Sequence, residues 1–338
     1  MFQRFRADSC YIIAEIGGNF TNLEGARRLI DRAAECGVDA VKLQTYRADT
    51  VASRKAVFDM ENTGVVSQHE LFKKYEIGEK LHGDVFDYAE SKGLDWFSTP
   101  SHETDVDLLE RFGVGAHKIG SDDAVNIPFL RYVARTGKPM ILSTGMCTLE
   151  EVRESVSAIL GEGNKKLILL HAITSYPTHP EYVNLDAMQT LMREFPNLDV
   201  GYSDHTLSPV ACLCAAAMGA RVLEKHFTYD KRADGPDHML SADPTEMKWL
   251  VESVRAFELM RGSGVKQPAE SERTTRLNNR KSVVIARAVS AGQQLARADL
   301  AVKRPGTGIA PRDFDQVIGR VVRSDMEADA VLTWDHLL

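Results

Sequence analysis

The stretch Val200-Gly201-Tyr202-Ser203-Asp204-His205 decides the fold: a short apolar run that ends in residues able to do chemistry. An apolar segment over 207–218 follows and predicts a helix, and a second such run, Leu223-Glu224-Lys225-His226, comes next. The same alternation extends back to the N-terminus through runs at 12–15, 41–44, 96–99, 117–121, 141–145 and 169–171. These strand–helix units predict a (β/α)8 TIM barrel, in which the C-terminal ends of the strands form the active face.

The chain is longer than a barrel requires. It has 338 residues, whereas a typical barrel has about 250. We expect a barrel domain over 1–262, a polar linker over 263–280, and a small β-rich domain over 281–338 with short β-like runs separated by turns. The segment 46–77 is longer than a usual βα loop and has no clear periodicity, so we expect it to lie over the active face as a lid.

Composition and net charge argue against a nucleic-acid-binding protein and against a membrane protein. The chain is 43% hydrophobic and 26% charged, as in ordinary soluble proteins. A net charge of −7 argues against a nucleic-acid partner, although local Lys residues still permit an anionic substrate. The five cysteines include no Cys-x-x-Cys pair, which is typical of reduced thiols. We find neither a signal-like apolar stretch nor an apolar run long enough for a membrane span, so we expect a cytoplasmic protein without a membrane partner.

Two histidines end consecutive predicted strands. His205 follows the seventh run and His226 ends the eighth. Neutral imidazoles are good ligands for divalent transition metals, and neighbouring strand ends can bring both into one coordination sphere. Two protein ligands leave positions open for water and substrate, which suits a Lewis acid. A lone histidine is more often a hydrogen-bonded core residue, but the matched positions of these two favour a metal site.

Two lysines, Lys42 and Lys118, lie in the second and fourth runs. A lysine inside a barrel is costly unless an anion or a carboxylate lies nearby. Hydroxyl residues occupy similar positions: Thr99, Ser121, Ser143 and Ser203. Lysines, hydroxyls and Gly-flanked amides together indicate a cradle for phosphate or carboxylate. Two alternatives remain open, namely a salt bridge to Glu15 and a Schiff-base lysine.

Two acidic residues complete the candidate set. Glu15 ends the first run, where a carboxylate could ligate a metal, act as a general base or accept a hydrogen bond from a substrate hydroxyl. Asp237 follows the eighth run within Gly235-Pro236-Asp237-His238. It could contact substrate, or it could simply be a turn residue after Gly-Pro.

The order of motifs along nearly the whole chain resembles that of one enzyme family. The motifs are Ala14-Glu15-Ile16-Gly17, Lys42-x-Gln44-Thr45, Ser98-Thr99-Pro100, Lys118-Ile119-Gly120-Ser121, Leu142-Ser143-Thr144-Gly145-Met146, Tyr176-Pro177-Thr178, Gly201-Tyr202-Ser203-Asp204-His205-Thr206, Glu224-Lys225-His226-Phe227-Thr228 and Gly235-Pro236-Asp237. They are similar to those of the sialic acid (N-acetylneuraminate) synthases and related nonulosonate synthases. The tail, with Val302-Lys303-Arg304-Pro305-Gly306, resembles the antifreeze-like (SAF) domain of that family.

The resemblance implies a transferase that condenses phosphoenolpyruvate (PEP) with the open-chain aldehyde of an N-acyl-mannosamine-type sugar, giving a sialic-acid-like nonulosonic acid and phosphate. It implies a catalytic set of Glu15, His205 and His226, in which the histidines hold a divalent metal, usually Mn2+, with Mg2+ or Co2+ as alternatives. PEP binding is implied for Lys42, Thr99, Lys118, Ser121, Ser143 and Ser203. Sugar binding is implied for Gln44, Tyr176, Asp237 and Arg304. It also implies a domain-swapped homodimer in which Arg304 serves the partner's site.

Three positions depart from the family pattern. The first strand is followed by Asn19-Phe20-Thr21-Asn22, the fourth by Ser121-Asp122-Asp123, and the sixth carries Thr174 where the family usually has Asn. These departures leave the metal and phosphate motifs intact and concern the identity of the sugar. Two other functions fit the same scaffold, namely a lysine Schiff-base aldolase and a non-catalytic carbohydrate-binding protein.

Overall fold

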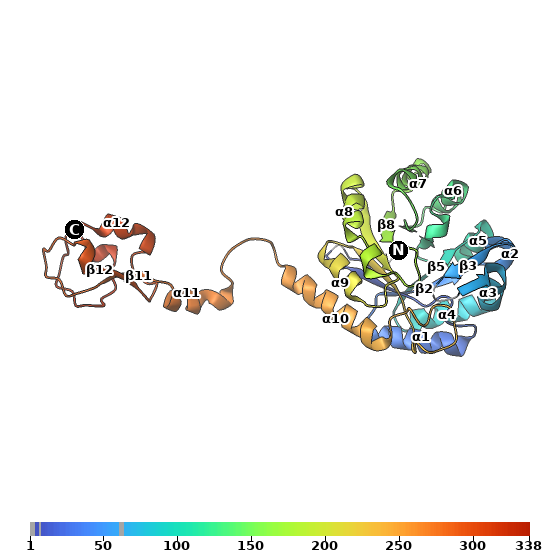
Figure 1. The fold of residues 1–338 in the computed structure, drawn as a ribbon, viewed down its shortest axis with the longest axis horizontal. Coiled ribbons are helices and arrows are strands. Elements are labelled where there is room, and N and C mark those ends of the chain that lie inside the picture. Colours follow the sequence, from blue (N-terminus) through green and yellow to red (C-terminus); the bar gives the residue numbers. More distant parts are fainter. Residues whose placement is uncertain (1–3, 7, 61–63) are drawn as a thin grey trace. The chain divides into compact units, whose positions relative to one another are not determined.

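The computed structural model describes residues 4–6, 8–60 and 64–338. The chain divides into two compact units, Met1–Arg261 and Gly262–Leu338. The first unit contains the predicted strand–helix repeats, and the second contains the tail (Figure 1).

A closed barrel of parallel strands forms the centre of the first unit, which confirms the predicted TIM barrel. Within the described residues the barrel strands are β1 (Tyr11–Glu15), β2 (Ala40–Thr45), β5 (Asp95–Pro100), β6 (His117–Ile119), β7 (Met140–Ser143), β8 (Leu167–Ala172), β9 (Asp199–Asp204) and β10 (Val222–His226). They are paired in the order β1-β10-β9-β8-β7-β6-β5-β2, and β2 returns to β1. Neighbouring strands along the chain are therefore neighbours in space, apart from the inserted β3 and β4.

The apolar runs form strands because both of their faces are covered. All residues of β1, β8 and β10 are buried, as expected for parallel strands between a packed barrel interior and an outer layer of helices. Eight helices flank these strands in the described first unit: α1 (Leu23–Cys36), α4 (Glu79–Ser91), α5 (Glu103–Phe112), α6 (Ile127–Ala134), α7 (Leu149–Gly161), α8 (Leu185–Glu194), α9 (Val210–Ala217) and α10 (Pro244–Arg261).

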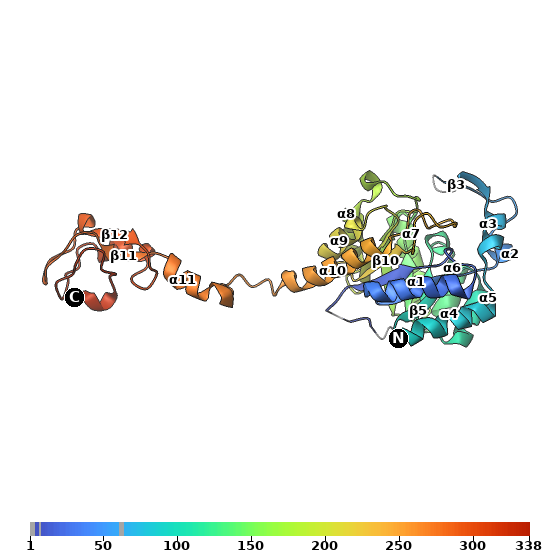
Figure 2. The same ribbon diagram turned by 90° about the horizontal axis from the view of Figure 1, so that it is seen from below.

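Helix α1 illustrates how the sequence sets these boundaries. The Asn22 side chain accepts a hydrogen bond from the Gly25 N–H and caps the first turn. Gly37 ends the helix at φ 80°, a left-handed conformation that favours glycine. The buried face of α1 includes Leu29 and Ile30, and the helix packs beside α10 and α4 (Figure 2).

The segment 46–77 is structured despite its lack of periodicity, and residues 61–63 within it lie outside the described part. It contains α2 (Ala48–Val51), a hairpin of β3 (Val57–Met60) and β4 (Gly64–Ser67), and α3 (Gln68–Tyr75). Aromatic contacts hold it together: the Tyr46 and Phe72 ring centroids lie 4.9 Å apart, and those of Phe58 and Phe72 lie 5.6 Å apart. These contacts join residues far apart in the sequence, so hydrophobic periodicity does not predict them.

The second unit has its own small core around an antiparallel pair, β11 (Ser282–Ile285) and β12 (Leu300–Lys303). After residue 280 the described part of this unit also contains α12 (Phe314–Val317) and the short 3-10 turns Arg297–Asp299, Pro311–Asp313 and Trp334–His336. The predicted linker 263–280 is exposed throughout, but it is not structureless, because it contains the 3-10 turn Glu270–Glu272 and helix α11 (Arg273–Asn279). No helix in the described ranges is long and apolar enough to cross a membrane.

Candidate active site

A cavity of about 430 Å3 opens at the C-terminal ends of the barrel strands, and most of the predicted site residues line it. These are Lys42, Gln44, Thr99, Lys118, Ser121, Ser143, Tyr176, Ser203, His205, His226 and Asp237. Strand geometry explains the convergence, since alternate residues of a strand share one face. Thus Ser203 and His205 project on one side of the strand end, as do Glu224 and His226.

The two lysines form the floor of the cavity together with hydroxyl groups. Lys42 Nζ donates to Thr99 Oγ1 at 2.8 Å, and Lys118 Nζ donates to Ser143 Oγ at 2.7 Å. Both lysine side chains are almost completely buried. Two buried cations surrounded by hydroxyls are suited to bind an anion with more than one charged group. The lysines and hydroxyls predicted to form an anion cradle therefore lie together in one spatial cluster.

Glu224 lies between the two lysines and was given no role from the sequence. Its Oε1 is 3.8 Å from Lys118 Nζ and 3.9 Å from Lys42 Nζ, and it accepts a hydrogen bond from Ser203 Oγ at 3.2 Å. Its other oxygen, Oε2, is buried and has no hydrogen-bond partner among the described residues. Its role could have been predicted from its position two residues before His226, because that spacing places both side chains on the same face of β10.

Burial and charge act on these groups in opposite directions. Burial lowers the pKa of Lys118 to about 8, although Glu224 opposes the shift. Burial alone would also lower the pKa of Lys42, but the Glu15 and Glu224 carboxylates raise it above its ordinary value. Burial would raise the pKa of Glu224, but the two lysines hold it below its usual range. Lys42 and Glu224 are therefore charged at neutral pH, and Lys118 is the cation closest to losing its proton.

Glu15 is buried and is not among the residues that line the cavity. Its carboxylate pairs with Lys42 and also accepts a hydrogen bond from the Gly17 N–H. The register explains the contact, because Glu15 is opposite Lys42 on β2 and opposite His226 on β10. The salt bridge to Glu15, one of the alternatives for Lys42, is therefore present.

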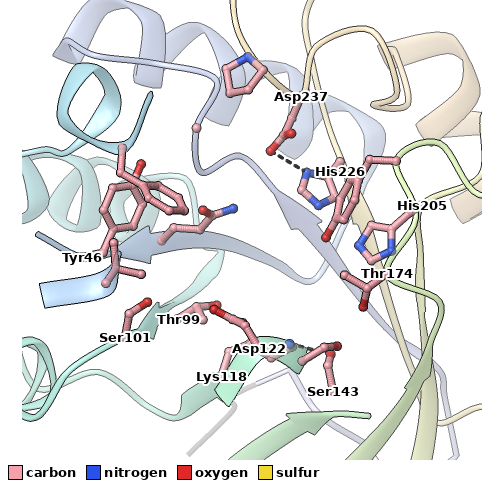
Figure 3. Close-up of a pocket in the computed structure, with 18 of the residues that line it drawn as sticks. Tyr46, Thr99, Ser101, Lys118, Asp122, Ser143, Thr174, His205, His226 and Asp237 are labelled. Atoms are coloured by element: carbon pink, nitrogen blue, oxygen red, sulfur yellow. Dashed lines mark hydrogen bonds and ion pairs between the residues drawn. The ribbon is translucent and has the colours of Figure 1, made fainter. Parts of the chain in front are cut away.

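The two histidines meet at one side of the cavity, with ring centroids 5.4 Å apart. His205 Nδ1 lies 2.7 Å from the Ile173 carbonyl oxygen, so it donates there and leaves Nε2 for other partners. His226 Nδ1 lies 3.4 Å from Asp237 Oδ2, longer than an ordinary hydrogen bond (Figure 3). Burial lowers the pKa of His205 to about 4, with His226 as the second cause. Burial would lower the pKa of His226 too, but Asp237 raises it above its ordinary value.

This donor set fits a divalent metal. Metal-binding histidines usually direct the second ring nitrogen to a backbone carbonyl or a carboxylate, and Ile173 and Asp237 are placed in this way. Within the described ranges, no three His, Cys, Asp or Glu side chains gather closely enough to form a complete protein ligand set. A metal held here would therefore keep several positions for water or substrate.

Thr174, the departure noted on the sixth strand–helix unit, faces the cavity. Its Oγ1 is buried and has no hydrogen-bond partner in the described part of the chain. Ser121 lies close by and accepts a hydrogen bond from the Gly145 N–H at 3.0 Å. A Cβ at position 145 would lie 2.2 Å from Thr174 Oγ1, so only glycine allows this approach. Thr174 thus offers a hydroxyl where the family pattern has an amide.

The segment 46–77 contributes to the cavity lining, as expected of an insertion over the active face, although the sequence did not single out its individual side chains such as Tyr46. Ser101 also lines the cavity without having been singled out, and Asp122, named above as a departure from the family pattern, lines it too. Tyr46 and Asp122 are placed in Figure 3 with the lysine and histidine groups. Arg304 belongs to the second unit, where it directly follows β12 and is exposed.

Known proteins match this chain along nearly its whole length. Residues 29–266 match the NeuB family, and residues 280–338 match the SAF domain. The N,N'-diacetyllegionaminic acid synthase of Legionella pneumophila is 42% identical over 338 residues, covering 97% of this chain and 95% of the relative. The enzyme of the same name from Campylobacter jejuni is 37% identical, covering 95% of this chain and 98% of the relative. The crystal structure of the N-acetylneuraminic acid (sialic acid) synthetase of Leptospira borgpetersenii has a TM-score of 0.71 and 32% identity, covering 79% of this chain and 90% of that chain.

Proposed function

The chain belongs to the NeuB family, and on that premise we propose that it is a synthase that condenses PEP with the open-chain aldehyde of an N-acyl-mannosamine-type sugar. The products are a nonulosonic acid and phosphate. The observation that carries the proposal is a two-lysine anion site and a histidine pair that line the same cavity. The names of the two relatives given above support the same reaction class and make N,N'-diacetyllegionaminic acid a candidate product.

The lysine floor is the proposed PEP site. Lys42 and Lys118 supply positive charge for the carboxylate and phosphate groups, and they are held in place by Glu15 and Glu224. The hydroxyls of Thr99, Ser121, Ser143 and Ser203 surround them and can donate hydrogen bonds to the same anion. Fixing PEP at two charged ends orients its C3 carbon for attack, which replaces a costly bimolecular encounter by a positioned one.

The histidine corner is the proposed aldehyde site. His205 and His226 would hold Mn2+, or Mg2+ or Co2+ in its place, and the bound metal would polarise the aldehyde oxygen as a Lewis acid. Asp237 Oδ2 lies 3.4 Å from His226 Nδ1 and lines the cavity, where it can accept a hydrogen bond from a sugar hydroxyl. Gln44 and Tyr176 line the cavity and can hydrogen-bond the hydroxyl and acyl groups of the sugar. In the reaction C3 of PEP bonds to the aldehyde carbon, water adds to C2, and phosphate leaves.

A homodimer is part of the proposal. Arg304 is exposed in its own unit, and the preceding residues 261–280 are exposed as well. A guanidinium offers several donors in a fixed plane, which suits the acyl and hydroxyl oxygens of a sugar. We assign Arg304 to the sugar site of the partner subunit.

The testing experiment measures phosphate release from PEP with a panel of N-acyl hexosamines, in the presence of Mn2+ and after removal of metal with EDTA. The expected result is metal-dependent phosphate release with at least one acceptor, together with a product whose mass equals acceptor plus pyruvate. Absence of phosphate release with every acceptor, or full activity after metal removal, would contradict the proposal.

One observation favours a second candidate, a Schiff-base aldolase. A buried lysine whose pKa lies near 8, as burial gives Lys118, is suited to attack a carbonyl group. The distinguishing test is borohydride reduction with substrate bound, followed by mass spectrometry. An adduct on Lys118 together with resistance to EDTA would support the aldolase, and an unchanged mass would support PEP condensation.

A further inference from the structure

The loop between β10 and α10, residues 227–243, brings Asp237 to the cavity. Asp237 lines the cavity, and its Oδ2 lies 3.4 Å from His226 Nδ1 (Figure 3). The carboxylate also lies close to the loop that follows β1, because a Cβ at position 18 would be 3.4 Å from Asp237 Oδ2. This carboxylate therefore lies where the loops after β1 and β10 meet.

Hydrogen bonds within the β10–α10 loop hold its shape. Ser241 donates to the Asp237 carbonyl oxygen twice, from its backbone N–H at 3.1 Å and from its Oγ at 2.6 Å. His238 Nδ1 lies 2.6 Å from Thr228 Oγ1. Ser241, His238 and Thr228 are all buried. These bonds fix the turn that carries Asp237, but they join residues of one loop and do not connect it to β1.

Asn19, in the loop after β1, makes that connection. Its Nδ2 donates to the Phe227 carbonyl at 3.0 Å and to Ser241 Oγ at 3.3 Å, and its backbone hydrogen-bonds the His238 ring. Asn19 is 4% exposed and does not line the cavity. Ser241 Oγ accepts from Asn19 and donates to the Asp237 carbonyl, so one hydroxyl links the two loops. A short chain of hydrogen bonds thus leads from Asn19 to Asp237.

Packing alone does not account for an amide at position 19. Asn19 Oδ1 is buried and has no hydrogen-bond partner among the described residues. A buried oxygen without a partner opposes folding and offsets much of what the donated bonds contribute. Local costs of this kind are expected where a side chain serves a functional site.

We propose that Asn19 is a positioning residue for the acceptor sugar: acting through Ser241, it fixes the Asp237 carboxylate at the point where the sugar binds. The inference rests on the proposed function, which assigns Asp237 to the sugar. Without the Asn19 amide the β10–α10 loop keeps its internal bonds but loses its side-chain connection to the loop after β1. Asp237 then moves relative to the cavity. The proposed PEP site on Lys42 and Lys118 lies on other strands, so it keeps its geometry.

Steady-state phosphate release tests this selectivity, with the N-acyl hexosamine of the panel that gives the highest rate as the probe sugar. Asn19→Ala should lower kcat/KM for that sugar by about 10- to 100-fold, the cost of misplacing a substrate contact by about 1 Å. KM for PEP and the affinity for Mn2+ should be unchanged. Ser241→Ala removes the linking hydroxyl and should show the same selective loss.

Asn164→Ala is the matched control. Asn164 is also 4% exposed, and its Nδ2 donates to the Lys138 carbonyl at 2.8 Å, but it does not line or contact the cavity. Its kinetic constants should equal those of the unmodified chain. Urea unfolding identifies the variants that are folded under the assay conditions, and if Asn19→Ala is not, Ser241→Ala takes its place in every comparison.

A double variant shows whether Asn19 acts through Asp237. Asp237→Ala removes the carboxylate, so it should itself lower kcat/KM for the sugar. Adding Asn19→Ala to Asp237→Ala should then cause no further loss, because the group that Asn19 positions is already gone. A merely structural role would instead give losses that add.

The outcomes separate the two proposals. Additive losses, equal losses toward sugar and PEP, an Asp237→Ala variant with unchanged kcat/KM for the sugar, or a similar loss in Asn164→Ala overturns the inference and leaves the synthase function standing. No phosphate release by the unmodified chain with any acceptor of the panel overturns the proposed function, and the inference falls with it.

Discussion

The buried ion pair between Asp204 and Lys225 should make the barrel sensitive to the loss of either partner alone. Lys225 Nζ lies 2.6 Å from Asp204 Oδ2, and the two side chains are 1% and 0% exposed. Asp204 and Lys225 directly precede His205 and His226 in the chain, so alternation points them away from the cavity. Neither residue lines the cavity. Substitutions here therefore test packing of the barrel rather than contact with substrate.

The two members of the pair differ in how many other hydrogen bonds they make. Without Lys225, Asp204 would still accept hydrogen bonds from Tyr202 Oη at 3.0 Å, Thr206 N at 3.0 Å and Thr206 Oγ1 at 3.1 Å. Without the Asp204 carboxylate, Lys225 would keep the Thr206 carbonyl at 2.7 Å. Removing one partner of a buried pair costs about 3–5 kcal/mol. We therefore expect about 3 kcal/mol for Lys225→Met and about 5 kcal/mol for Asp204→Asn.

Urea unfolding of the full chain, followed by far-UV circular dichroism, measures these losses. The double variant Asp204→Asn/Lys225→Met buries no charge at this position, so its loss should be smaller than the sum of the two single losses. Arg135→Met is the control for removing a charge, because the ion pair between Arg135 and Glu162 lies at the surface. The Arg135 side chain is 63% exposed. It should cost less than about 1 kcal/mol. Single losses below about 1 kcal/mol, or a double loss equal to the sum, would refute the reasoning.

Three further predictions concern the cavity and the tail. His226→Ala should lose most of its Mn2+ affinity, measured by electron paramagnetic resonance titration without substrate. His69→Ala is the control, because His69 lies outside the cavity, and it should bind Mn2+ as tightly as the unmodified chain. Equal Mn2+ binding by the two variants would contradict the metal site. Burial lowers the pKa of Lys118 to about 8, and its charged form attracts PEP, so kcat/KM for PEP should be highest below this pH and fall as pH rises through it. Lys118→Ala should lower kcat/KM at every pH and lack this decline, and a flat profile in the unmodified chain would argue against a charged Lys118 in binding. Mixing Arg304→Ala chains with His226→Ala chains under conditions of subunit exchange should restore activity, since a swapped mixed dimer has one site with an intact barrel and an intact tail. Demonstrated exchange without restored activity would rule out the swap.

The sequence by itself determined the barrel and much of its active face. Short apolar runs, each followed by a helical segment, are sufficient to predict parallel strands, and parallel strands bring their C-terminal ends to one side. His205 and His226 follow consecutive runs, so their proximity was predictable from chain order alone. The hydroxyls of Thr99 and Ser143 were found for the same reason.

Only the tertiary structure decided which of these groups contact each other. Glu15 pairs with Lys42 because the register of β1 against β2 sets the two residues opposite each other. Glu224 reaches Lys42, far from it in sequence, because the barrel closes between β1 and β10 and so brings β10 close to β2. The aromatic contacts of the segment 46–77 depend on packing within an insertion that has no period. Periodicity records which face of an element is covered, but it does not record the distant partner that covers it, and buried charges and ring contacts are set by that partner.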